Sequence, residues 1–134
     1  MTREVRESSI AITDGVRIAV RCRYLADHSF PQRQRYVFAY TVRIQNEGRQ
    51  PVQLLSRHWV ITDCAGKVEE VRGDGVVGEQ PILPPGSAFE YMSTATLALP
   101  RGRMHGSYQM RDLRGRTFDA TIAPFLLALP QSLN

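Results

Sequence analysis

The residues with the clearest chemical pattern form a glycine-rich string in the middle of the chain. Positions 73–78 fit G-x-G-x-x-G and consist of Gly73, Asp74, Gly75, Val76, Val77 and Gly78. In a dinucleotide-binding fold, such a string opens a helix whose N-terminus holds a pyrophosphate. Residues 79–86 contain three prolines, which exclude that helix. The string therefore predicts either a small nest of amides for an anion or glycines that only let a loop turn.

Metal ligands are scattered along the sequence. The two cysteines and three histidines show neither C-x-x-C nor H-x-x-x-H spacing, so we expect no structural zinc and no cofactor. A surface site for a divalent cation at Asp74 and Glu79 is the weaker hypothesis. Cys22 lies on the apolar face of a predicted strand, whereas Cys64 lies in a predicted turn. We therefore expect two free thiols in a reducing compartment.

Nucleophilic catalysis needs a nucleophile, a base and an orienting group that meet at one point. Ser56, His58 and Asp63 come from a single predicted strand and project at fixed offsets, so they do not converge. Partners on other strands are not visible in the sequence. The pattern favours a protein that is not an enzyme and assigns no catalytic residue.

Arginine accounts for 16 of the 17 basic residues, and the formal net charge is +4. Proteins that bind single-stranded nucleic acid interleave such bases with exposed aromatic rings. Here the alternation places Tyr24, Phe38 and Tyr40 among the apolar residues, on faces that we expect to be buried. The chain is net basic towards both ends and net acidic over residues 50–99. This distribution argues against nucleic acid and favours a protein partner, with a mixed solvated surface as the alternative.

The elements that must position these residues are strands. Period-two alternation or a continuous apolar run predicts strands at residues 16–24, 36–44, 52–63, 89–97, 105–110 and 117–122. Asp comes first and Gly fourth at 63–66 and 112–115, which is typical of type I turns. The sequence predicts an all-β fold, an antiparallel sandwich of about seven strands in the immunoglobulin or fibronectin type III style. An open barrel is the alternative.

Length and composition set the frame for that fold. The 134 residues, with 43% hydrophobic and 22% charged residues, fit one globular domain over positions 1–134. The N-terminal residues contain no apolar segment typical of a secretion signal, and no apolar run is long enough to span a bilayer. We expect a cytoplasmic protein with no membrane partner. The sequence does not define its oligomeric state.

Several segments together resemble a known family. They are residues 56–63, 73–81, 85–86, 89–91, 104–110 and 124–125. In these segments the chain is similar to the ApaG family, and the similarity extends over nearly the whole sequence. The resemblance implies a fibronectin type III-like sandwich in a small bacterial protein without an established enzymatic activity. It also implies links to cobalt or magnesium homeostasis, to genes for an rRNA dimethyltransferase and a diadenosine tetraphosphate hydrolase, and to protein binding in larger eukaryotic proteins.

The residues and the resemblance together favour one function over another. The first hypothesis is a non-catalytic module that binds a protein partner, which the sequence does not identify. The alternative is a sensor that binds a polyphosphate nucleotide with a divalent cation at the loop of residues 73–78. Hydrolysis of such a nucleotide is the weakest of the three.

Overall fold

The computed structural model describes residues 7–130. Two short 3₁₀ helices, η1 (Ala26–His28) and η2 (Pro31–Arg33), follow the second strand. The described residues contain nine strands, which are β1 (Ser9–Thr13), β2 (Val16–Tyr24), β3 (Tyr36–Asn46), β4 (Val52–Asp63), β5 (Val68–Asp74), β6 (Ile82–Leu83), β7 (Ala88–Leu97), β8 (Arg101–Asp112) and β9 (Thr117–Ala128). The six predicted strands are all present, and β1, β5 and β6 are additional.

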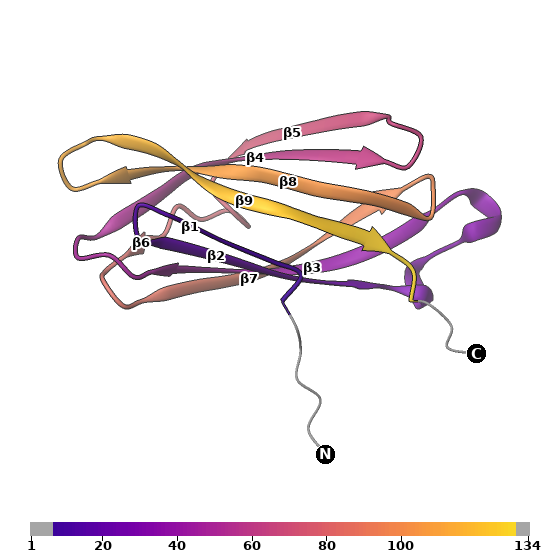
Figure 1. Ribbon diagram of the computed structural model, residues 1–134, viewed down its shortest axis with the longest axis horizontal. Coiled ribbons are helices and arrows are strands. Elements are labelled where there is room, and N and C mark those ends of the chain that lie inside the picture. Colours follow the sequence, from indigo (N-terminus) through magenta and orange to yellow (C-terminus); the bar gives the residue numbers. More distant parts are fainter. Residues whose placement is uncertain (1–6, 131–134) are drawn as a thin grey trace, which may run out of the picture.

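The strands form two antiparallel sheets that pack face to face (Figure 1). The first sheet has the order β1-β2-β3-β7, and the second has the order β5-β4-β8-β9 with β6 beside β4. This arrangement confirms the predicted antiparallel sandwich. Without β1 and β6, the remaining strands make sheets of three and four strands. The fourth of them, β5, pairs with the third, β4, whereas an immunoglobulin constant domain pairs its fourth strand with its fifth.

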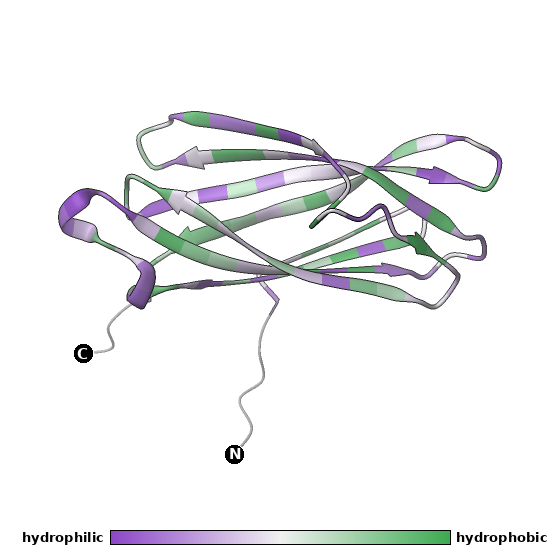
Figure 2. Cartoon of the chain, turned by 180° about the vertical axis from the view of Figure 1, so that it is seen from behind, coloured by the Kyte–Doolittle hydropathy of each residue, from purple (hydrophilic) through white to green (hydrophobic). Residues whose placement is uncertain are grey.

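Side chains that point between the sheets form one core. Hydropathy alternates along the strands (Figure 2), and on β2 this leaves Ile18 and Val20 buried and Arg23 exposed. Trp59 lies at the centre of the core, with its ring 5.2 Å from that of Tyr40 and 6.0 Å from that of Phe125. Burial of these large aromatic and aliphatic side chains is the main force that holds the two sheets together.

The predicted turns connect the strands of the second sheet. The amide of Gly66 donates to the carbonyl of Asp63, and the amide of Gly115 donates to that of Asp112. Both glycines have a positive φ, which they adopt without the steric cost of a Cβ. These bonds confirm the two Asp-first, Gly-fourth turns expected from the sequence.

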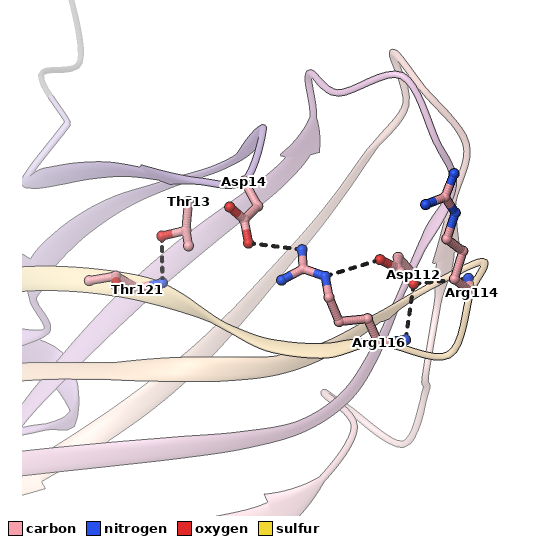
Figure 3. A network of polar contacts seen from close by, with 6 residues as sticks. All are labelled: Thr13, Asp14, Asp112, Arg114, Arg116 and Thr121. Atoms are coloured by element: carbon pink, nitrogen blue, oxygen red, sulfur yellow. Dashed lines mark hydrogen bonds and ion pairs between the residues drawn. The ribbon is translucent and has the colours of Figure 1, made fainter.

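One side of the sandwich is tied by contacts between the sheets. The amide of Thr121 on β9 donates to the hydroxyl of Thr13 on β1 (Figure 3). Arg116 bridges Asp14 in the β1–β2 turn and Asp112 in the β8–β9 turn, at 3.2 and 3.3 Å. This network lies at the end of the molecule opposite the two 3₁₀ helices (Figure 1). Within residues 7–130, none of the helices is long and apolar enough to cross a bilayer.

Candidate functional site

The glycine-rich string ends β5 and continues into a tight turn. Gly73 and Asp74 are the last residues of β5, and the amide of Gly75 donates to the carbonyl of Leu55 at 2.8 Å. Gly75 has φ 63°, and a Cβ there would lie 2.2 Å from the carbonyl oxygen of Glu79. A glycine is therefore required at this position by the turn itself.

The turn uses much of its own hydrogen-bonding capacity. Val76 is fully buried, and its amide and carbonyl both bond to Glu79. The Arg57 guanidinium packs against Gly73 and donates to the carbonyls of Asp74 and Gly75, the latter at 2.8 Å. Two of the amides that an anion nest would need, those of Gly75 and Val76, thus already have backbone acceptors.

The carboxylates of this region do not assemble with other metal ligands. Asp74 and Glu79 are both exposed, one at the end of β5 and the other after the turn. In residues 7–130, no group of three or more His, Cys, Asp or Glu side chains lies close enough together to hold a metal ion. The cation hypothesis at Asp74 and Glu79 therefore has no further protein ligand in the described part of the chain.

Beside this turn, the outer surface of the second sheet is polar; we call it the polar face. A depression of about 690 Å³ lies on it. Its lining residues are Ser56, Arg57, His58, Arg72, Gly73, Asp74, Ser107, Gln109 and Asp119. The hydroxyl of Ser56 donates to Gln109 Oε1 at 2.8 Å, and Gln109 Nε2 donates to Ser107 Oγ at 2.9 Å. The polar side chains on this face thus bond to one another.

Three residue types of a hydrolase triad lie near one another on the polar face. Ser107 on β8 is paired in register with His58 on β4, and His58 Nε2 lies 2.8 Å from Glu70 Oε1 on β5. This row combines three strands and was not visible in the sequence. Among the described residues, however, no hydrogen bond joins Ser107 to His58, and Ser107 Oγ accepts its bond from Gln109. A nucleophile without a bonded base is not activated in the way a triad requires.

Burial suppresses ionisation of the inward-facing groups. Burial raises the pKa of the Cys22 thiol to about 11, whereas Cys64 is exposed, and both cysteines are free. Burial also raises the pKa values of Tyr91 and Tyr108, whose hydroxyls are hydrogen-bonded to each other inside the core. These tyrosines are therefore neutral structural groups at physiological pH.

A larger hollow than the depression on the polar face lies on the other side of the sandwich, on the outer surface of the first sheet. It has a volume of about 1130 Å³, and we call it the basic groove. Its lining residues are Arg23, Leu25, Asp27, His28, Phe30, Arg33, Gln34, Arg35, Val37, Ala39, Met92, Thr94, Thr96, Leu97 and Ala98. Strands β2, β3 and β7 form its floor, and the segment of residues 25–35 with both 3₁₀ helices forms a wall.

That wall is fixed to the sheet by a buried serine. The hydroxyl of Ser29 donates to the carbonyl of Leu25 at 2.7 Å and accepts from the amide of Val37 at 2.9 Å. The segment is then closed by mutual backbone bonds between Phe30 and Arg35. Phe30 lies in this closed segment with 51% of its surface exposed.

This groove was not predicted from the sequence. Arg23 on β2 is exposed on its surface. Phe30, Arg33, Arg35 and Met92 were not identified as site residues. The signal that was available is the string from Phe30 to Arg35, in which an aromatic residue, a proline and two arginines interrupt two strands. These residues form the wall of the groove only because Ser29 fixes the segment to the sheet. A sequence pattern does not show that Ser29 is buried and makes these bonds.

The described residues thus define an antiparallel β-sandwich whose two outer faces differ, one polar and one basic and grooved. A profile of the ApaG domain matches residues 26–112. Protein ApaG of Thiobacillus denitrificans is 56% identical over 119 residues, which cover 89% of this chain and 94% of that protein. Protein ApaG of Anaeromyxobacter dehalogenans is 51% identical over 126 residues, covering 94% and 99%.

A crystal structure described as an ApaA protein of Bordetella pertussis agrees in fold and sequence. Its TM-score is 0.85 at 50% identity, and the match covers 87% of this chain and 95% of that one. The chain belongs to the ApaG family. This membership confirms the resemblance noted in the sequence. The names of these relatives state no catalytic activity.

Proposed function

We propose that this chain is a non-catalytic, cytoplasmic binding module that recognises a protein partner through the outer face of its first sheet. The observation that carries the proposal is the basic groove. It combines a large open volume with a wall held rigidly by Ser29. Exposed apolar side chains, Phe30 and Met92, lie in the same hollow as three arginines. Apolar groups collected in a polar-rimmed hollow are typical of interaction sites.

Site-specific photocrosslinking in cells of the source organism tests this function. A benzophenone amino acid replaces Thr94 in the groove, and in a matched variant it replaces Thr121 on the polar face; both positions are exposed. The proposal expects defined protein adducts from position 94 and far fewer from position 121, identified by mass spectrometry. Equal adducts from both positions, or no protein adduct from position 94, would contradict it.

The second hypothesis is a polyphosphate nucleotide with a divalent cation at residues 73–78. The polar depression beside Gly73, with Arg57 and Arg72 in its lining, favours it. Against it stands the turn, which directs the carbonyls of Asp74 and Gly75 towards Arg57. Calorimetry with diadenosine tetraphosphate, with and without Mg²⁺ or Co²⁺, tests this hypothesis, and absence of heat in all these conditions rejects it. If this chain binds no cation itself, we propose that any link to cation homeostasis is indirect and depends on the protein partner.

A further inference from the structure

The shape of the basic groove follows from small side chains in its floor. Ala39 on β3 is paired in register with Arg23 on β2 and with Thr94 on β7. Val37 and Ala39 are buried under the groove, with 6% and 3% of their surface exposed. Because Val37 and Ala39 are short while Arg23 and Met92 beside them are long, a trough is left between β7 and the wall of residues 25–35. An extended chain fits such a trough better than a globular surface does.

The charge of the groove is strongly one-sided. Arg23, Arg33 and Arg35 line it together with a single carboxylate, Asp27. Within residues 7–130, none of these arginines forms an ion pair, whereas the neighbouring Arg21 on the same face pairs with Glu90 at 3.2 Å. Guanidinium groups that keep their donors in solvent match carboxylates with two parallel hydrogen bonds. The groove is therefore complementary to an acidic ligand.

The apolar side chains of the groove distinguish between two kinds of acidic ligand, a peptide and a nucleic acid. Phe30 is the only Phe, Tyr or Trp residue in the lining, and the guanidinium of Arg33 lies 6.0 Å from the centre of its ring. Single-stranded nucleic acids need several exposed rings along a basic track, which this groove lacks. Phe30 and Met92, which are 51% and 59% exposed, instead offer contact to a large apolar side chain. This combination favours a peptide over a nucleic acid.

We propose that the basic groove binds an extended acidic segment of a partner protein. Carboxylates of that segment pair with Arg23, Arg33 and Arg35, and a large apolar side chain between them packs against Phe30 and Met92. This inference rests on the proposed function and names the chemistry of its partner. Since residues 25–35 are held by internal bonds, the groove is formed before binding, and little ordering entropy opposes association.

Fluorescence anisotropy with synthetic probes tests the inference. The probe is a short labelled peptide in which glutamates flank a central leucine–phenylalanine pair, and the comparison peptides replace either the glutamates by glutamine or the central pair by serine. Wild-type protein is expected to bind the probe and to bind each comparison peptide at least about tenfold more weakly. Added salt should weaken binding of the probe, because exposed charges are screened.

Protein variants then locate the site. Arg23→Glu and Arg33→Glu should each weaken binding by at least about tenfold, whereas Arg103→Glu, an exposed arginine of the second sheet, should leave it unchanged. Phe30→Ala should also weaken it. Since all four side chains are exposed, the variants are expected to fold, which circular dichroism checks.

The outcomes separate this inference from the proposed function. If the probe fails to bind, or if Arg103→Glu weakens binding of the probe as much as Arg33→Glu does, the acidic-segment proposal is wrong. Crosslinking from position 94 would still support a protein partner of another chemistry. If a labelled oligothymidylate binds more tightly than the peptide and loses binding in Phe30→Ala, the groove is a nucleic-acid site, and the peptide proposal is overturned.

Discussion

The two outer faces of the sandwich use their polar groups in opposite ways. On the polar face, Ser56, Gln109 and Ser107 form a chain of hydrogen bonds, and His58 is held by Glu70. On the first sheet, the arginines of the basic groove have no ion-pair partner among residues 7–130, and Phe30 lies half exposed. The polar groups of one face bond to one another, whereas the arginines of the basic groove on the other face are left to solvent.

This difference indicates which face stabilises the folded chain and on which face we expect a partner to bind. Hydrogen bonds within a face stabilise the folded chain by about 1 kcal/mol each. Charged donors and apolar surface left in solvent contribute little to folding and gain free energy only when a partner covers them. We therefore expect substitutions on the polar face to change stability and substitutions in the basic groove to change binding.

The largest expected effect tests how closely β4 and β8 approach each other in the second sheet, beneath the polar face. Gly106 on β8 is paired with Trp59 on β4, and a Cβ at Gly106 would lie 2.0 Å from the carbonyl oxygen of His58. Gly106→Ala should cost about 3 kcal/mol or more, because the clash is with backbone that cannot move without breaking the sheet. Urea unfolding measures this cost.

Gly78→Ala is the matched control for that variant. Gly78 has φ 80°, but a Cβ there meets nothing within 4 Å. Only the cost of the left-handed conformation applies, about 1 kcal/mol. If Gly106→Ala lowered the free energy of unfolding by no more than Gly78→Ala does, the inference that β4 and β8 approach closely at Gly106 would be wrong.

The second prediction concerns the wall of the basic groove. Ser29→Ala removes two hydrogen bonds and leaves the carbonyl of Leu25 and the amide of Val37 without their partner. We expect a loss of about 2 kcal/mol in unfolding free energy and faster hydrogen exchange at the Val37 amide. Ser107→Ala, on the polar face, removes one accepted bond and should cost about half as much. Equal protection of the Val37 amide in wild type and Ser29→Ala would contradict the anchoring role.

The sequence was informative about the fold because the fold follows local rules. Period-two alternation, together with one continuous apolar run at residues 52–63, located six of the nine described strands, and the Asp-first, Gly-fourth pattern located two turns. The strand predicted to end near residue 122 continues to Ala128, since a register shift in the β8–β9 pairing lets β9 pass Pro124. Such an irregularity depends on the partner strand and leaves no clear sequence pattern.

The candidate site was less predictable, because it depends on contacts between distant segments. The glycine string was recognised, but the role of Arg57, which holds its carbonyls, was not. The row of Ser107, His58 and Glu70 appears only when three strands are in register. The basic groove needs β2, β3, β7 and the loop of residues 25–35 together. No single segment carries these arrangements.

The third prediction sets one side chain of each face against the other. Ser56→Ala breaks the half-buried bond to Gln109 and should lower the free energy of unfolding by about 1 kcal/mol without changing affinity for the acidic peptide. Met92→Ala removes a side chain that is 59% exposed. It should change the free energy of unfolding by less than about 0.5 kcal/mol and should lower the affinity for the acidic peptide. Thermal unfolding and anisotropy on the same samples measure both. The reverse assignment of the two effects would refute the division between the faces.

The smallest expected effect lies at the far end of the sandwich, in the network around Arg116 (Figure 3). Desolvation acts to raise the pKa of Asp112, but hydrogen bonds from the amides of Arg116 and Arg114 and from the Arg116 guanidinium outweigh it and lower that pKa. A carboxyl whose pKa is lower in the folded state stabilises the fold above its ordinary pKa. That contribution is lost as pH falls through the lowered value.

Asp112→Asn keeps an oxygen that accepts from the amides of Arg114 and Arg116 but removes the charge. The melting temperature of wild type should therefore fall more steeply than that of Asp112→Asn as the pH drops through the acidic range. High salt should narrow the difference, because the guanidinium of Arg116 is exposed to solvent. Affinity for the acidic peptide should be the same in both proteins at neutral pH. A shift in that affinity would mean that the two ends of the sandwich are coupled, and the separation of stabilising and binding surfaces would then fail.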